Sequence, residues 1–290
     1  MNSVESKKVT VRSLIRKKKK GDRITMLSVY EYITALLADR AGVDAVLVGD
    51  SLAMTMLGYE TTLPVTMEEM LCHVKAAARA RPRALLIADM PFMSFQVSPE
   101  EAVRNAGRML KEGGAEAVKI EGGRCMVRTV EALLAAKIPV MGHVGLTPQA
   151  IHTFGGYRVQ GKTESAAKAL LEDARCLEEA GCFSIVLEGI PSDVAGEITG
   201  SLSIPTIGIG AGPHCDGQVL VGHDILGLVE GDLPRFVRGY ADLKTAILDA
   251  FSRYVDDVRK GDYPTPEESY EYGKDGKDGK DGKDGKNSKD

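Results

Sequence analysis

Short apolar segments alternate with longer amphipathic segments along most of the chain. Eight runs rich in Val, Ile, Leu and Ala have the length of buried β-strands: residues 24–30, 45–50, 84–90, 117–122, 138–145, 184–190, 204–212 and 225–229. Between them, apolar residues recur at helical spacing over residues 66–80, 99–112, 124–136 and 164–180. A repeated strand–helix–strand order predicts parallel strands joined by right-handed crossovers.

The number of these repeats indicates the fold class. Eight strand–helix units within about 250 residues fit one closed (β/α)8 TIM barrel, whereas a Rossmann-like open sheet is the main alternative. The glycine motif "GIGAG" at residues 208–212 has the spacing GxGxG instead of GxGxxG, and it lies near the seventh predicted strand instead of the first. We therefore expect an α/β barrel in which these glycines let a ligand or a loop approach the backbone.

The two ends of the chain differ from the region between them. Residues 273–290 repeat Gly-Lys-Asp without an apolar residue, which predicts a disordered low-complexity tail. Residues 1–272 are expected to form a single catalytic barrel domain. Near the N-terminus, the run from Lys17 to Lys20 precedes Gly21, as expected for the basic end of a short helix. A patch for nucleic acid or a membrane surface is the alternative reading of that run.

Composition argues against several classes of function. The chain has 290 residues, 43% of them apolar, and a formal net charge of −4, so it has no overall basic field to attract nucleic acid. Its five cysteines are scattered without a CxxC pair, which argues against a disulfide framework and a zinc site and favours a reducing compartment. The charged N-terminus lacks an apolar signal, and no apolar run approaches about 18 residues. We expect a cytoplasmic protein without a membrane span.

Polar side chains stand where five of the predicted strands end. "LVGDS" ends on Asp50 and Ser51, "LLIADMPF" contains Asp89, "VKIEGG" contains Glu121, "VMGHVG" contains His143 and "IVLEGI" contains Glu188. In a barrel, the carboxyl ends of the strands form the face where barrel enzymes keep their chemistry. A single acidic residue there commonly caps the next helix or fixes a turn, but four carboxylates on one rim indicate a functional site.

The four carboxylates predict a bound cation. Like charges at the ends of apolar strands are costly unless a metal ion or protons neutralise them. Oxygen ligands without nearby Cys or paired His select a hard ion such as Mg²⁺ instead of zinc. Because side chains alternate along a strand, Lys119 shares a face with Glu121 and points into the barrel. There it pairs with a carboxylate, holds an anionic substrate, or does both.

These groups suit a small 2-oxo acid as substrate. A metal ion can chelate the keto and carboxylate oxygens of such an acid, while Lys119 adds positive charge and Ser51 offers a hydroxyl group. Chelation would acidify the neighbouring C–H bond and stabilise an enolate. The residues alone leave the electrophile open.

Longer motifs resemble one family closely. "GHVGLTPQ", "FGGYRVQGK", "EAVKIEGG" and "VDAVLVGDSLAMTMLGYETTLPVT" are long and specific, and the resemblance runs from about residue 7 to about residue 264. By these motifs the chain resembles ketopantoate hydroxymethyltransferase (3-methyl-2-oxobutanoate hydroxymethyltransferase), of the phosphoenolpyruvate mutase and isocitrate lyase superfamily. The resemblance implies transfer of a one-carbon unit from 5,10-methylenetetrahydrofolate to 3-methyl-2-oxobutanoate. The product would be 2-dehydropantoate, in pantothenate and coenzyme A biosynthesis.

The same resemblance implies roles for the residues at the strand ends. It implies that one Mg²⁺ ion per subunit is held by Asp50, Asp89 and Glu121, and that Glu188 is the general base that removes the C3 proton. The oxo acid would be bound by Asp50, Ser51, Asp89 and Lys119. The resemblance also implies a homo-oligomer, often a homodecamer, that acts on small molecules and binds neither nucleic acid nor membrane.

Two histidines have no assigned role at this point. His143 stands at a strand end that suits a partner of the metal or substrate, and a neutral histidine bonded to the backbone is the alternative. His152 lies in a segment that resembles the family's folate side, but its residue type alone implies no role.

Two other functions are compatible with parts of the pattern. One is a lyase or phosphonomutase of the same superfamily that uses Mg²⁺ and an enolate on another 2-oxo acid. Against it, the chain lacks the "KKCGH"-type loop that isocitrate lyases carry. The other is a barrel that has lost catalysis, and the retained carboxylates argue against it because clustered charges are costly without a use.

Overall fold

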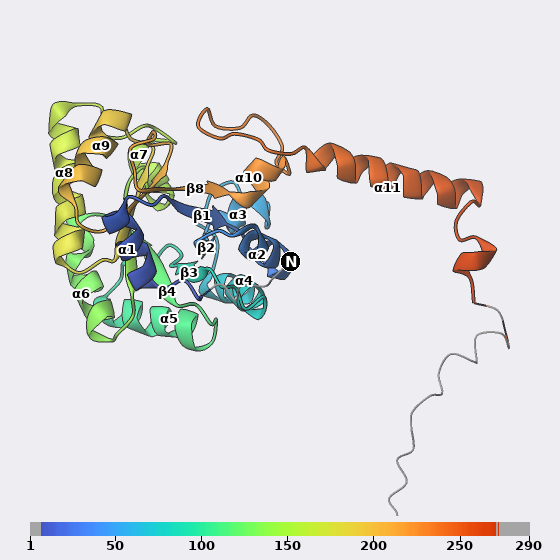
Figure 1. The fold of residues 1–290 in the computed structure, drawn as a ribbon, viewed down its shortest axis with the longest axis horizontal. Coiled ribbons are helices and arrows are strands. Elements are labelled where there is room, and N and C mark those ends of the chain that lie inside the picture. Colours follow the sequence, from blue (N-terminus) through green and yellow to red (C-terminus); the bar gives the residue numbers. More distant parts are fainter. Residues whose placement is uncertain (1–6, 271, 273–290) are drawn as a thin grey trace, which may run out of the picture. The chain divides into compact units, whose positions relative to one another are not determined.

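The central element of the fold is a closed barrel of parallel strands. A computed structural model describes residues 7–270 and 272, and its eight strands pair in sequence order around the barrel (Figure 1). This confirms the predicted (β/α)8 TIM barrel. The strands are β1 (Ile24–Ser28), β2 (Ala45–Val48), β3 (Leu85–Asp89), β4 (Ala117–Glu121), β5 (Val140–Gly145), β6 (Ser184–Glu188), β7 (Thr206–Ile209) and β8 (Gly217–Val221).

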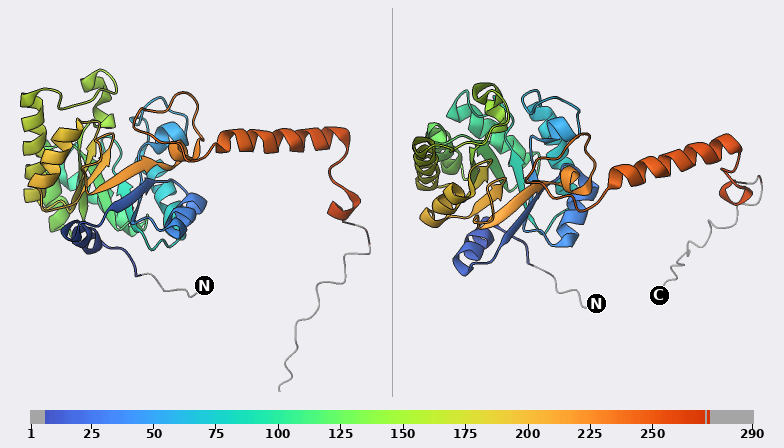
Figure 2. Two further views of the ribbon diagram at one scale, coloured as in Figure 1. Left: turned by 45° about the horizontal axis from the view of Figure 1, so that its top comes forward. Right: turned by 90° about the horizontal axis from the view of Figure 1, so that it is seen from above.

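Helices follow the strands and lie outside the barrel. The four predicted helical segments correspond to α4 (Met67–Arg79), α5 (Pro99–Lys111), α6 (Val127–Ala135) and α8 (Glu164–Glu179), which surround the strands in Figures 1 and 2. The others in this part of the chain are α1 (Val11–Lys20), α2 (Tyr32–Ala41), α3 (Leu52–Thr55), α7 (Ile151–Phe154), α9 (Ser192–Ser201) and α10 (Gly222–Leu226), with the 3-10 turns η1 (Arg124–Met126) and η2 (Pro148–Ala150).

The eighth predicted strand, residues 225–229, is wrong. The structure places β8 at Gly217–Val221, and the next residues form the short helix α10. Gly217 lies opposite Ile24 of β1, where an added Cβ would come within 2.5 Å of the Ile24 carbonyl oxygen. Glycine permits this close approach. Because a glycine and a glutamine open β8, only three apolar residues remain in it, and the sequence pattern favours the apolar run that follows.

Helix α1 closes one end of the barrel. Leu14 is fully buried in the cluster of side chains that fills the barrel interior. The predicted basic end of α1 is observed, and its lysines have specific partners. Lys17 Nζ lies 2.7 Å from Asp44 Oδ1, and Lys18 Nζ lies 2.8 Å from Asp216 Oδ2. Both aspartates immediately precede strands, so these two lysines tie the helix to the amino-terminal ends of β2 and β8.

Replacing Leu14 by alanine is expected to lower the free energy of unfolding by about 2–5 kcal/mol, because it leaves a cavity among tightly packed side chains. Urea denaturation would measure the change. Lys19→Ala, on the exposed side of the same helix, serves as the control and should stay within about 0.5 kcal/mol of the wild-type value. Equal stabilities for the two variants would show that α1 does not complete the barrel core.

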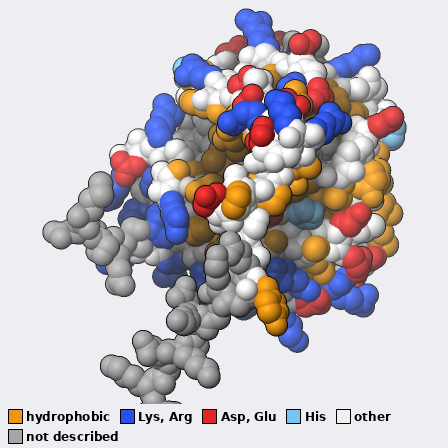
Figure 3. Space-filling view, turned by 90° about the vertical axis from the view of Figure 1, so that its right-hand side faces the viewer, with side chains coloured by type: hydrophobic (Ala, Val, Ile, Leu, Met, Phe, Trp, Pro, Cys, Tyr) orange, Lys and Arg blue, Asp and Glu red, His pale blue; other side chains and the backbone are white. Residues whose placement is uncertain are grey.

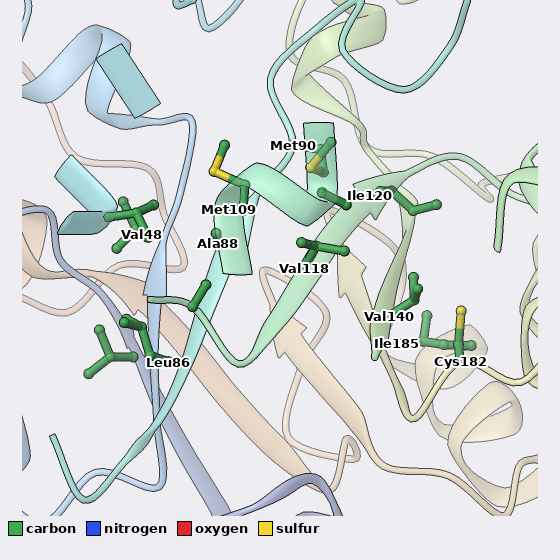
Figure 4. Packing of buried hydrophobic residues seen from close by; sticks show 14 of the residues in the cluster. Val48, Leu86, Ala88, Met90, Met109, Val118, Ile120, Val140, Cys182 and Ile185 are labelled. Atoms are coloured by element: carbon green, nitrogen blue, oxygen red, sulfur yellow. The ribbon is translucent and has the colours of Figure 1, made fainter. Parts of the chain in front are cut away.

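A second core lies between the strands and the surrounding helices. Figure 4 shows its packing, in which side chains from neighbouring strands meet Met109 of α5 and other residues. The residues labelled there include Val48, Leu86, Ala88, Val118, Ile120, Val140 and Ile185. Strands that are buried on both faces account for the continuous apolar runs in the sequence.

The chain divides into two compact units between Ala241 and Asp242. The second unit contains α11 (Leu243–Lys260) and the 3-10 turn η3 (Pro266–Glu268). The single domain expected over residues 1–272 remains a prediction, and the predicted tail at 273–290 lies outside the described residues.

Charged side chains of both signs lie on the surface, and the cysteines are unpaired. On the face shown in Figure 3, basic and acidic side chains are interspersed. All five cysteines fall within the described residues and are free thiols. None of the described helices is long and apolar enough to cross a membrane.

Candidate active site

The register of the strands brings the predicted site residues together. At the ends of neighbouring strands, Asp89 lies opposite Lys119, and Glu121 lies opposite His143. Glu188 ends β6, the next strand around the barrel. Because the strands are parallel, all of these residues share the carboxyl-terminal face of the barrel.

A cavity of about 440 Å³ opens at this face. Every residue expected to contact the metal ion, the substrate or the reacting proton lines it, namely Asp50, Ser51, Asp89, Lys119, Glu121 and Glu188. His143 lines the same cavity, whereas His152 lines a separate cavity of about 350 Å³. Many of the remaining wall residues are apolar, including Leu47, Met54, Leu146, Val186, Ile209 and Phe236. An apolar cleft with a few convergent polar groups is the usual form of a small-molecule site.

Lys119 is the buried cation of this site. Its Nζ lies 2.8 Å from Asp89 Oδ1 and 3.9 Å from Glu121 Oε1. Burial alone would lower the pKa of this lysine, but Asp89, Glu121 and Asp50 together raise the pKa above its ordinary value. Lys119 therefore carries a fixed positive charge inside the barrel.

The three carboxylates around Lys119 differ in their ionisation. Burial, reinforced by the charges of Asp89 and Glu121, raises the pKa of Asp50 well above its ordinary value. Burial also raises the pKa of Asp89, although Lys119 opposes the shift. Burial would raise the pKa of Glu121 too, but His143 and Lys119 lower it. The site thus crowds more negative charge together than Lys119 alone can balance.

His143 lies between two glutamates. Its Nδ1 is 3.5 Å from Glu121 Oε1, and its Nε2 is 3.2 Å from Glu188 Oε2. Burial and Lys119, whose Nζ is 3.3 Å from Nδ1, lower the pKa of His143, but the two glutamates raise it to about 9. The two glutamates thus favour the protonated form of His143, which lies between their carboxylates.

This histidine predicts a loss of stability in mild alkali. Because its pKa rises from 6.5 to about 9 on folding, His143 stabilises the fold fully below pH 6.5 and loses this contribution as the pH rises through about 9. The complete shift corresponds to about 3 kcal/mol. Urea unfolding in EDTA, between about pH 6 and pH 10, should show this decline in the wild-type protein and a smaller one in His143→Asn. Parallel profiles for both proteins would contradict the assignment.

Two further residues of the site were not identified from the sequence. Tyr30 is fully buried, and its hydroxyl group lies 2.8 Å from Ser51 Oγ, which it holds at the cavity wall. Gln149 donates from Nε2 to Asp50 Oδ2 at 2.9 Å. Gln149 ends the motif "GHVGLTPQ" and Tyr30 ends the predicted strand at residues 24–30, but tyrosine and glutamine do not by themselves indicate a metal or substrate site.

The oxygen donors are close together but bound to protein groups. No three Asp, Glu, His or Cys side chains among the described residues are arranged so that they could hold a metal ion as they stand. Asp89 Oδ1 and Glu121 Oε1 are buried and form ion pairs with Lys119, but neither oxygen accepts a hydrogen bond from a described residue. These two oxygens are the buried acceptors that an additional cation or donor would satisfy.

Comparison with known sequences matches the chain over nearly its whole length. Residues 8–266 match the family model described as ketopantoate hydroxymethyltransferase. A protein named 3-methyl-2-oxobutanoate hydroxymethyltransferase from Pelobacter propionicus is 59% identical over 264 residues, which cover 91% of this chain and 98% of that protein. One of the same name from Moorella thermoacetica is 55% identical over 263 residues, with coverage of 91% and 98%.

The solved structures that resemble the chain are more distant in sequence. A phosphonopyruvate hydrolase in complex with oxalate and Mg²⁺ has a TM-score of 0.59 at 15% identity, over 89% of this chain and 93% of that one. A 2,3-dimethylmalate lyase, a member of the PEP mutase/isocitrate lyase superfamily, has a TM-score of 0.58 at 19% identity, over 89% and 92%. At these identities the likeness shows the shared barrel fold alone.

Proposed function

Because the chain belongs to the ketopantoate hydroxymethyltransferase family, we propose that its strand-end carboxylates hold a divalent cation and supply the general base of its reaction. The enzyme is a hydroxymethyltransferase that acts on 3-methyl-2-oxobutanoate. We propose 5,10-methylenetetrahydrofolate as the one-carbon donor. The product is then 2-dehydropantoate, a precursor of pantothenate.

The observation that carries this proposal is a buried lysine among carboxylates in one cavity. Lys119 Nζ is the positive group that can bind the carboxylate of the oxo acid, and Ser51 Oγ, held by Tyr30, can donate a hydrogen bond to the same substrate. The apolar walls suit the substrate's methyl groups. The cavity also exceeds the size of a five-carbon acid, so room remains for the reacting end of the folate.

The type of donor atom suits a magnesium ion, although no three of the described Asp, Glu, His or Cys side chains are arranged to hold one as they stand. Asp50, Asp89 and Glu121 would hold it, since they offer oxygen atoms, the ligand type that hard divalent ions prefer. Burial, and then the charges of Asp89 and Glu121, raise the pKa of Asp50, and a divalent cation would relieve the part that comes from repulsion between these carboxylates. When bound, the ion would withdraw electron density from the substrate's oxo group and stabilise the charge left by the C3 proton.

Glu188 is the proposed base because of its position and its partner. It lies at the cavity wall with 17% of its side chain exposed, and one of its oxygens is 3.2 Å from His143 Nε2. His143 faces one oxygen of this carboxylate, and the other oxygen would take the C3 proton. The resulting carbon nucleophile forms a bond to the methylene carbon as the first carbon–nitrogen bond of that carbon to the folate breaks. The second carbon–nitrogen bond breaks when water supplies the hydroxyl group, and the two folate nitrogens take up one proton from C3 and one from water.

Deuterium exchange from solvent into C3 of 3-methyl-2-oxobutanoate tests the proposal in two stages. Exchange that requires Mg²⁺ and stops with EDTA would support both the cation and the base. Subsequent addition of 5,10-methylenetetrahydrofolate should then produce 2-dehydropantoate. Exchange without product would favour a lyase or mutase of the same superfamily, whereas no exchange in the presence of Mg²⁺ would contradict the enolate chemistry.

We further propose a cytoplasmic homodecamer. This proposal rests on the family resemblance of the motifs. Sedimentation velocity tests the assembly: the expected mass is ten times the 31.1 kDa of the chain. A monomer or dimer at micromolar concentration would contradict it.

A further inference from the structure

Gln149 connects several parts of the site from within its wall. It belongs to η2 (Pro148–Ala150) and is only 7% exposed. Its Nε2 donates to Asp50 Oδ2 at 2.9 Å and to the Met90 carbonyl oxygen at 2.9 Å, and its backbone N–H donates to Glu121 Oε2 at 3.0 Å. One residue thus binds two of the proposed metal ligands, which come from different strand ends.

Gln96 fixes the orientation of the Gln149 amide. Its own amide nitrogen donates to Gln149 Oε1 at 2.9 Å. Both hydrogens on Gln149 Nε2 meet oxygen acceptors, so a flipped amide would set Oε1 against two other oxygens. The Gln149 amide is therefore held in one orientation, because both its oxygen and its nitrogen have hydrogen-bond partners.

These contacts use one oxygen of each carboxylate. Gln149 binds Oδ2 of Asp50 and Oε2 of Glu121, and Glu121 Oε1 accepts no hydrogen bond from any described residue. A carboxylate held by one oxygen presents the other in a fixed direction. Such presentation matters for Mg²⁺, which requires a nearly ideal octahedral arrangement of its ligands.

We propose that Gln149 is a positioning residue that presents Asp50 and Glu121 to the metal ion. This inference rests on the cation site of the proposed function. Gln149 itself does not bind the ion, because both polar atoms of its amide already have protein partners. Loss of the hydrogen-bond partner of a metal ligand typically weakens metal binding by about 10- to 100-fold.

The test is a calorimetric titration of the full-length protein with Mn²⁺ alone. Gln149→Met removes the amide while keeping an unbranched side chain of similar length. It should bind one ion per subunit with a dissociation constant about 10- to 100-fold larger than that of the wild type. Gln218→Met, the same change at an exposed position outside the cavity wall, is the matched control and should keep the wild-type affinity.

Melting temperatures of the metal-free variants separate loss of the fold from loss of affinity. A folded Gln149→Met protein that binds Mn²⁺ as tightly as the wild type would overturn the positioning role. If this variant does not fold, Gln96→Met decides instead, because it frees only the Oε1 end of Gln149. A smaller weakening in the same direction is expected there, and unchanged affinity would overturn the proposal. No binding by the wild-type protein would overturn the cation site itself, and the positioning role with it.

Discussion

Replacing Glu188 by glutamine is expected to slow exchange of the C3 proton of 3-methyl-2-oxobutanoate by about 10²- to 10⁴-fold, the usual contribution of a general base. Glutamine keeps the shape of the side chain and can keep an oxygen facing His143 Nε2, which lies 3.2 Å from Glu188 Oε2 in the wild type. Its neutral amide cannot take up the proton. Proton NMR follows the exchange, and calorimetry should show that the oxo acid still binds.

Glu197→Gln provides the matched control for this experiment. Glu197 lies on the exposed side of α9, so the same substitution there should leave exchange at the wild-type rate. Near-normal exchange by Glu188→Gln would remove Glu188 from the base role. Loss of exchange together with loss of substrate binding would instead indicate that its charge is needed to assemble the site.

The barrel could be predicted because its strands are buried on both faces. Seven of the eight runs of apolar residues coincide with strands, and most positions in those strands are apolar. The exception, β8, begins with Gly217, whose place beside the Ile24 carbonyl group demands a residue without Cβ. The packing of β8 against β1, where the barrel closes, requires this glycine. A glycine adds no apolar signal to the local sequence.

The site was predictable to the extent that it depends on strand ends. Parallel strands set the rim residues side by side, so Asp89, Lys119 and Glu121 followed from the alternation and the fold. The contacts made by connecting loops did not follow. Gln149 and Asp50 are separated by 99 residues of sequence but form a hydrogen bond. Lys17 of α1 pairs with Asp44 only in the folded barrel. No local pattern encodes such pairings.

Asp50→Asn should change the stability and the metal affinity of the protein in opposite directions. In the metal-free protein, burial and the charges of Asp89 and Glu121 raise the pKa of Asp50, so its ionised form is unfavourable in the fold. A neutral amide of the same shape removes that repulsion. We therefore expect a higher melting temperature in EDTA for Asp50→Asn. The gain should grow as the pH rises from acid to neutral, because a carboxyl with a raised pKa stabilises the fold only while it is protonated.

The same substitution removes a charged oxygen ligand from the proposed cation site. Mn²⁺ affinity should fall by more than about 100-fold, since loss of a ligand's hydrogen-bond partner alone costs about 10- to 100-fold. Asp232→Asn, in an exposed loop, is the control and should change neither property. A variant that is more stable without metal and still binds Mn²⁺ normally would place the cation elsewhere. One that loses stability in EDTA would show that Asp50 is held mainly by its attraction to Lys119 and by the hydrogen bond from Gln149, and not opposed by its acidic neighbours.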